Sequence, residues 1–161
     1  MEEKTYTISQ AQLYFAVDFH TKTWELLDKR DRTVEDNERM IGYAYASLAH
    51  WRTAGTAARH QRGEWMLARV YSALRDGKQA SQHAYRCAEI IQGNTDEMSD
   101  FDFAFAFEAI ARAHAVLGER AEAERFVRKA REAGEKIKEA EDRTTFFAEL
   151  KGGEWHGVKV E

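Results

Sequence analysis

Hydrophobic positions along the chain recur at the spacing of amphipathic helices, with one segment that fits two patterns. Residues 100–107, DFDFAFAF, place a phenylalanine at every second position, which is typical of a half-buried strand. In a helix, Phe101 and Phe105 would share one face and the other two phenylalanines a second face. A helix apolar on two faces fits the inside of a helical stack. Ser99 and Asp102 also have the spacing of a capping box, so we expect a helix here.

Polar and glycine-containing segments divide the chain into about seven predicted helices. These segments are residues 28–37, 53–56, 75–78, 92–100, 117–120 and 132–135. Short connections between amphipathic segments are typical of helices packed as antiparallel hairpins. The sequence contains no proline, which suits a chain that is mostly helix. The pattern therefore predicts an all-α fold.

Two of the predicted hairpins are related in sequence. Residues 67–90 and 110–133 align without gaps, and their equivalent positions carry residues that match in kind. The matched pairs are Leu67 and Ile110, Ala68 and Ala111, Tyr71 and His114, Leu74 and Leu117, Ala80 and Ala123, and Cys87 and Ala130. This agreement predicts one structural unit that occurs twice.

The spacing of these positions resembles the tetratricopeptide repeat, most clearly over residues 62–133. Gly118 stands at the turn glycine of that family, Phe126 at the aromatic position of the second helix, and Phe107 at the leading aromatic position. The chain departs from the family in two ways: the units are further apart than the family's ~34 residues, and the closing proline is missing. The chain looks similar to small stand-alone bacterial proteins of this kind.

The resemblance implies an all-α, right-handed α-solenoid of about seven antiparallel helices that forms one domain over residues 1–151. The predicted parts are a diverged first hairpin at 1–56, the clearest repeats at 57–91 and 99–133, a capping helix at 134–151, and a tail at 152–161 that is frayed or packed on the surface. Whether residues 1–56 form a true repeat stays open. Phe146, Phe147 and Leu150 would form a stripe on the capping helix, and if left uncovered this stripe would be a self-association surface.

The family uses a concave groove to hold peptides, which implies a non-catalytic scaffold or adaptor for protein binding. By position, the groove would be lined by Arg62, Trp65, Arg69, Phe105, Glu108 and Arg112. Arginines beside exposed aromatics are typical of binding hot spots, so we expect an acidic partner or a peptide carboxylate. In that case, replacing Arg69 and Arg112 by alanine should leave stability nearly unchanged. The alternative is that these charges are solvated or pair as Arg69–Glu108 and Glu108–Arg112.

Other functions remain open as alternatives. A small-ligand sensor could use a pocket near His50, Trp51 and Trp65, and an enzyme could use Glu108 with a nearby histidine. Homodimerisation through the terminal helices is a third possibility. The sequence has no nucleophile-elbow, phosphate-loop or dinucleotide-binding motif, so we expect no catalysis and no cofactor.

Metal binding is not expected either. His60 and Glu64, like His83 and Cys87, are one helical turn apart, but two ligands do not complete a zinc site. Cys87, the single cysteine, occupies a position where the repeat has a small buried residue. We therefore expect an inert core thiol.

The composition indicates which classes of partner the protein is not expected to bind. The chain has 161 residues, 43% hydrophobic and 32% charged, with a formal net charge of −4. The acidic balance argues against nucleic acid binding, which depends on phosphate neutralisation. No apolar segment approaches the ~20 residues of a membrane span, and the N-terminus lacks the pattern of a signal peptide. We expect a cytoplasmic protein.

Overall fold

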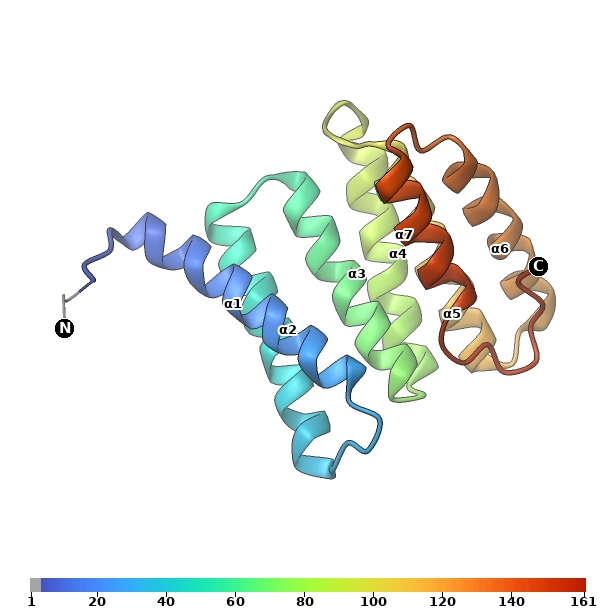
Figure 1. The fold of residues 1–161 in the computed structure, drawn as a ribbon, viewed down its shortest axis with the longest axis horizontal. Coiled ribbons are helices and arrows are strands. Elements are labelled where there is room, and N and C mark those ends of the chain that lie inside the picture. Colours follow the sequence, from blue (N-terminus) through green and yellow to red (C-terminus); the bar gives the residue numbers. More distant parts are fainter. Residues whose placement is uncertain (1–3) are drawn as a thin grey trace.

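A computed structural model describes residues 4–161, and within that range the chain is all-α with seven α-helices (Figure 1). The helices are α1 (Ile8–Asp28), α2 (Val34–Ala54), α3 (Ala57–Ala73), α4 (Gly77–Gly93), α5 (Asp100–Leu117), α6 (Arg120–Glu135) and α7 (Ala140–Lys151). A single 3-10 turn, Thr95–Glu97, lies between α4 and α5. The expected start of the first hairpin, at residues 1–3, lies outside the described part of the chain.

Consecutive helices pack against one another as three hairpins in a row, α1 with α2, α3 with α4, and α5 with α6 (Figure 1). Helix α3 also packs directly on α5, so the first helices of the second and third hairpins lie side by side. Helix α7 packs on α5 and α6 at the C-terminal end of the row. The prediction of an all-α stack of helical hairpins is confirmed.

The phenylalanine-rich segment is helical, as predicted. Ser99 is the N-cap of α5, where its backbone N–H and its hydroxyl donate to Asp102 Oδ2 at 3.0 and 2.9 Å. Gly118 ends the helix in the left-handed conformation, with φ of 77°, which a residue without a Cβ adopts without strain. Phe101 packs on Phe105 one turn later, with ring centroids 4.6 Å apart.

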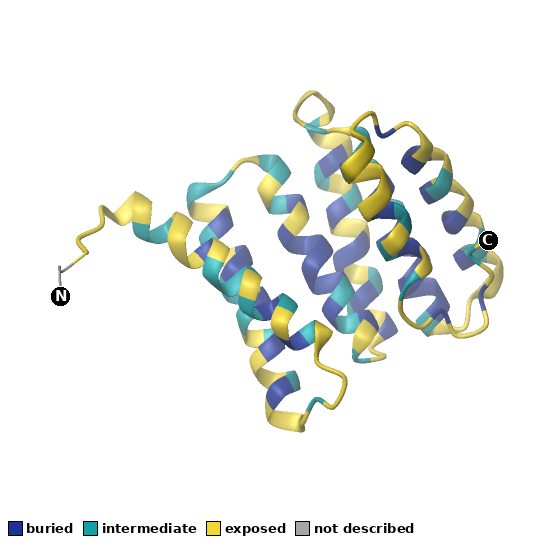
Figure 2. Cartoon of the chain, in the orientation of Figure 1, coloured by how far each residue is buried: buried dark blue, intermediate teal, exposed yellow. Residues whose placement is uncertain are grey.

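The two related hairpins share their core positions (Figure 2). The small residues Ala68 and Ala111 are fully buried in α3 and α5. The equivalence extends to ring stacking between the two helices of each hairpin. Tyr71 stacks on His83 with a centroid distance of 5.7 Å, and His114 stacks on Phe126 at 5.8 Å. Equivalent residues therefore make equivalent contacts in both hairpins.

One predicted break is wrong. The glycine at 132–135 was expected to lie in a turn, but α6 continues to Glu135 and the chain turns only after it. Gly134 lies inside α6, and the absence of a side chain there allows α7 to pack closely against it. A Cβ at this position would overlap the ring of Phe146.

The expected capping helix covers the last hairpin. Phe146 and Leu150 of α7 are fully buried, and Phe146 packs edge-on against Phe105 at 5.1 Å. The tail that follows is packed against the protein: Trp155 is buried, and its indole N–H donates to the carbonyl oxygen of Leu150 at 2.9 Å. The buried part of the α7 stripe is therefore not available as a self-association surface.

The N-terminal helix leaves much of its apolar surface exposed. Ile8, Tyr14 and Val17 of α1 are each more than half exposed. Among residues 4–161, none of the helices combines the length and the apolar character needed to cross a bilayer.

Candidate functional site

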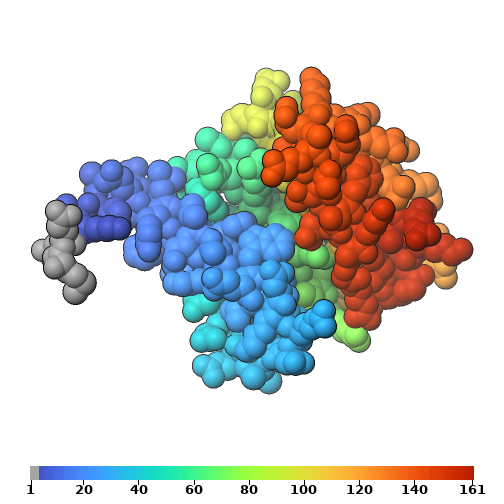
Figure 3. Space-filling model, in the orientation of Figure 1, coloured from blue at the N-terminus to red at the C-terminus, as the bar shows by residue number. Residues whose placement is uncertain are grey.

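A groove runs between α1 and α7, with α3 and α5 as its floor. In the space-filling view, a hollow separates α1 and its loop from α7, and α3 is visible at the bottom (Figure 3). The floor residues follow one face of each helix: Gln61, Arg62, Trp65, Arg69, Ser72 and Ala73 on α3, and Phe101, Asp102, Phe105, Arg112 and Val116 on α5. Side chains one turn apart share a helix face, which is why these positions line up.

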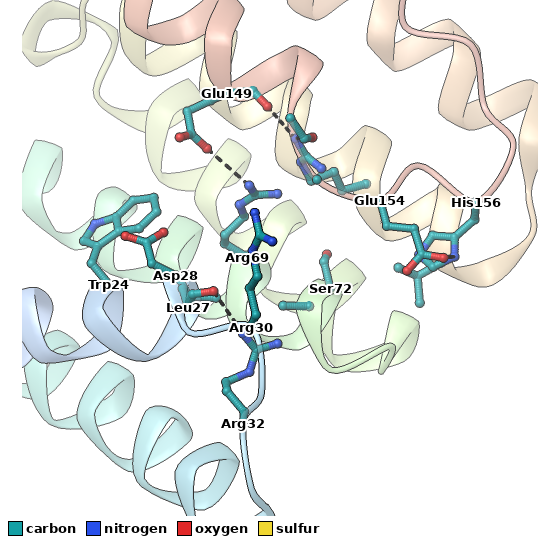
Figure 4. Close-up of a pocket in the computed structure, with 15 residues that line it drawn as sticks. Trp24, Leu27, Asp28, Arg30, Arg32, Arg69, Ser72, Glu149, Glu154 and His156 are labelled. Carbon is teal, nitrogen blue, oxygen red and sulfur yellow. Dashed lines mark hydrogen bonds and ion pairs between the residues drawn. The ribbon is translucent and has the colours of Figure 1, made fainter.

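One end of the groove is a cavity of about 660 Å³ whose lining includes four arginines and the carboxylates of Asp28, Glu149 and Glu154 (Figure 4). Arg69 and Arg112 come from the floor, whereas Arg30 and Arg32 come from the connection after α1. In Figure 4 the side chains of Arg30 and Arg69 extend toward the same part of the cavity. Ser72, in the same lining, is 8% exposed and its hydroxyl has no hydrogen-bond partner among the described residues.

The other end is an aromatic cavity of about 240 Å³, with walls of Trp24, Trp65, Phe101 and Phe105. Trp65 packs on Trp24 at 5.8 Å and meets Phe105 edge-on at 5.3 Å. Trp24 and Glu149 line both cavities, so the two are adjoining halves of one groove.

A buried ion pair lies beneath the junction of the two halves. Glu108 is fully buried, and Arg112, one turn further along α5, donates its Nε–H to Glu108 Oε1. The Nη1 atom of Arg69 lies 3.9 Å from the same carboxylate oxygen. Burial lowers the pKa of Arg112, and the charge of Glu108 opposes that shift. The pair is therefore part of the internal structure of the groove.

Arg112 also joins the floor to the C-terminal wall. Its Nη2 atom donates to the carbonyl oxygens of Glu149 and Gly152, at 2.7 and 2.9 Å, and its guanidinium lies 4.2 Å from the ring centre of Trp155. Arg69 adds a hydrogen bond of 3.2 Å to the side chain of Glu149. These contacts hold the end of α7 beside the arginine-lined cavity.

The structure brings the six predicted groove residues together on α3 and α5, but it does not expose the two aromatic residues as expected. Trp65 and Phe105 are each only 8% exposed, because α1 and α7 pack at the sides of the floor. Both pairings of the alternative prediction, Arg69–Glu108 and Glu108–Arg112, are present. Whether the groove binds a ligand stays a prediction.

Several groove residues were not predicted from the sequence. Trp24, Arg30 and Arg32 belong to the first hairpin, and Glu149 and Gly153 to the C-terminal segment. Neither segment belongs to the repeat that guided the prediction. The concentration of charge in residues 28–32 was visible, but the direction in which that connection faces depends on the packing of α1.

The residues of the alternative small-ligand pocket have different neighbours. His50 hydrogen-bonds to Gln12 of α1, Trp51 packs under the guanidinium of Arg59, and Trp65 faces the groove. Among these three residues, the structure therefore connects only Trp65 with the candidate site.

The histidine and cysteine positions are accounted for by internal contacts. His83 pairs with Glu64 in the core at 2.6 Å, and His60 lies 3.0 Å from the carbonyl oxygen of Trp51. Cys87 is fully buried, and burial raises the pKa of its thiol, which agrees with the predicted core role. Within the described range, no three histidine, cysteine, aspartate or glutamate side chains are grouped as metal ligands.

Comparison of the chain with known proteins found no similar protein. No family model matches the chain, and no curated protein or solved structure matches it either.

Proposed function

We propose that the protein is a non-catalytic, tetratricopeptide-like scaffold that holds an acidic segment of a protein partner in the groove. The observation that carries the proposal is the cavity lined by Arg30, Arg32, Arg69 and Arg112. Guanidinium groups are well suited to carboxylates because they offer paired donors in a fixed plane.

Two of these arginines have no carboxylate of their own. Among the described residues, neither Arg30 nor Arg32 forms an ion pair, whereas Arg112 pairs with Glu108 and Arg69 pairs with Glu149 and lies 3.9 Å from Glu108. Arg32 is nevertheless held in place: its Nη1 atom donates to the carbonyl oxygens of Leu26, Leu27 and Lys29 at 3.2, 2.9 and 3.0 Å. A positioned charge without a counter-charge favours an incoming anion, since little side-chain order is lost on binding.

The length of the groove suits a peptide. Its lining on α3 extends from Gln61 to Ala73, which spans about 18 Å at the rise of an α-helix. An extended chain of about five residues has this length.

Charge reversal at the most accessible arginine tests the proposal. Arg30 is exposed, so Arg30→Glu should fold normally and weaken binding of a fluorescent, terminally blocked peptide of glycine, serine and several glutamates by about tenfold or more. The matched control is Arg128→Glu, because Arg128 is exposed on α6 and lines neither cavity. Equal weakening by both variants, measured by fluorescence anisotropy, would contradict the groove assignment.

A small-ligand sensor is the second candidate, and the aromatic cavity beside Trp65 favours it because its volume suits a single ring. A higher thermal midpoint with free 3-phenylpropionate, without any effect of acidic peptides, would support this alternative. The enzyme alternative gains no support from the geometry, since Glu108 is fully buried and paired. Homodimerisation and a cytoplasmic location stay predictions.

A further inference from the structure

We infer that the aromatic cavity receives an aromatic side chain of the same bound segment, so that the partner carries an aromatic residue about four residues away from its acidic ones. The inference rests on the proposed function and specifies the partner's chemistry. It concerns the half of the groove that the arginines do not line.

The cavity has the size and the surface for one ring. Its volume of about 240 Å³ exceeds the roughly 150 Å³ of an engineered protein cavity that binds benzene, so a ring and its linking methylene would fit. Four aromatic residues line it, and aromatic pairs in offset or edge-on contact contribute about 0.5–1.5 kcal/mol beyond their buried area.

The polar groups around the cavity are already paired with one another. Asp102 Oδ1 accepts hydrogen bonds from Gln61 Nε2 at 2.7 Å and from Arg62 Nε at 3.1 Å. The indole N–H of Trp24 donates to His20 Nε2 at 3.1 Å. An apolar ring entering the cavity would therefore leave these polar groups with their partners.

Trp155, an aromatic residue of the C-terminal tail, does not fill the aromatic cavity. Trp155, in the tail beside α7, is fixed by its hydrogen bond to Leu150 and its contact with Arg112, at the arginine end of the groove. The adjoining positive charge favours an occupant whose ring and carboxylates belong to one extended segment.

The helices of the floor set the spacing. On α3, the aromatic cavity is lined by residues around Arg62 and Trp65, and the arginine-lined cavity by residues from Arg69 to Ala73. The two groups are about eight positions apart, or about 12 Å along the helix. An extended peptide covers that distance in about four residues.

Three terminally blocked peptides in a glycine–serine background test the inference. The first carries one phenylalanine and a pair of glutamates about four residues away, the second has alanine in place of phenylalanine, and the third has the phenylalanine directly beside the glutamates. We expect the first to bind the wild-type protein at least tenfold more tightly than the other two, as measured by fluorescence anisotropy of labelled peptides.

A variant that narrows the cavity provides the matching test on the protein. Thr145 lines the aromatic cavity and is exposed, so Thr145→Phe should fold and should reduce the advantage of the phenylalanine peptide over the alanine peptide from tenfold to less than about twofold. Thr144→Phe, at the neighbouring exposed position of α7 that lines neither half of the groove, should behave as wild type. Thermal midpoints of both variants confirm folding.

The outcomes separate the inference from the function on which it rests. Equal binding of the phenylalanine and alanine peptides, still weakened by Arg30→Glu, would overturn the inference and leave the proposed function standing. If none of the peptides binds, both are wrong. If free 3-phenylpropionate binds as tightly as the first peptide and displaces it, the cavity is a small-ligand site and the peptide assignment is overturned.

Discussion

Arg112 lies one helical turn from Glu108 on α5, and the ion pair between them is almost completely buried beneath the groove, at 3% and 0% exposure. Charged groups are buried at a cost unless they are paired and hydrogen-bonded. Arg112 meets that condition by donating to Glu108 and to two carbonyl oxygens at the end of α7. The pair therefore connects the floor of the groove with its C-terminal wall.

Removal of the charge on Glu108 should destabilise the fold. Glu108→Gln leaves Arg112 without its counter-charge in a buried position, and we expect a loss of about 3–5 kcal/mol in the free energy of unfolding. Urea denaturation followed by circular dichroism measures it. The control is Glu122→Gln, because Glu122 pairs with Arg125 on the surface and should lose less than about 1 kcal/mol. Equal losses would show that the pair beneath the groove is not structural.

The same contacts change an expectation from the sequence. Replacing Arg69 and Arg112 by alanine was expected to leave stability nearly unchanged, on the view that both side chains line an open groove and bind a partner. With Arg112 buried and hydrogen-bonded to the end of α7, that double variant should be destabilised. Arg30 is therefore the better position at which to test binding.

Gly153 lies against Arg69 and Arg112 and should not tolerate a side chain. Its φ is 74°, and a Cβ there would lie 3.0 Å from Arg112 Nη1. We expect Gly153→Ala to lose about 1–2 kcal/mol, since the left-handed conformation alone is unfavourable by that amount for a residue with a Cβ.

Gly42 provides the control for this substitution. It lies within α2, where a Cβ would meet nothing within 4 Å, so Gly42→Ala should instead gain about 0.5–1 kcal/mol. Urea midpoints of the two variants measure the contrast. Shifts of the same sign in both would contradict the account of the C-terminal wall.

Ala68 and Ala111 test the equivalence of the two hairpins. Both are fully buried at matching positions of α3 and α5, and enlarging either side chain should overpack a close contact. We expect Ala68→Leu and Ala111→Leu each to lose about 1–3 kcal/mol or more. Ala121→Leu, at an exposed position of α6, should be neutral. A leucine variant at either buried position as stable as wild type would argue against the shared register.

His20, at the edge of the aromatic cavity, should make stability depend on pH. Burial, and then the positive charge of Arg62, lower its pKa from the ordinary value of 6.5. The unfolded chain therefore takes up a proton near pH 6.5 while the folded chain does not, and the free energy of unfolding falls as the pH drops below that value. His20→Gln should show a smaller loss between about pH 7 and about pH 5. Parallel stability curves for the two proteins would contradict this.

The helical class and the pairing of helices could be predicted because they depend on local patterns. The capping box at Ser99 and the spacing of apolar positions both act within one or two helical turns. The face that α3 and α5 present could be predicted for the same reason, since residues such as Trp65 and Arg69 are one turn apart.

The walls of the groove could not be predicted because they depend on contacts distant in sequence. Trp24 meets Trp65 through the packing of the first hairpin, and Arg112 meets Gly152 through the position of α7. The sequence carries no local signal for either contact. Gly134 is a further example. It lies within α6, where it leaves room for the ring of Phe146 from α7, and it does not form a turn.

The indole N–H signals of the tryptophans in a ¹H–¹⁵N NMR spectrum would show whether the peptide binds in the groove. Trp24 and Trp65 line the groove, whereas Trp51 lies away from it beside Arg59. During titration with the peptide that carries phenylalanine about four residues from its glutamates, the signals of Trp24 and Trp65 should shift and saturate together, while that of Trp51 stays in place. Saturable binding that leaves Trp24 and Trp65 unshifted, or that shifts Trp51 instead, would contradict the assignment of the groove.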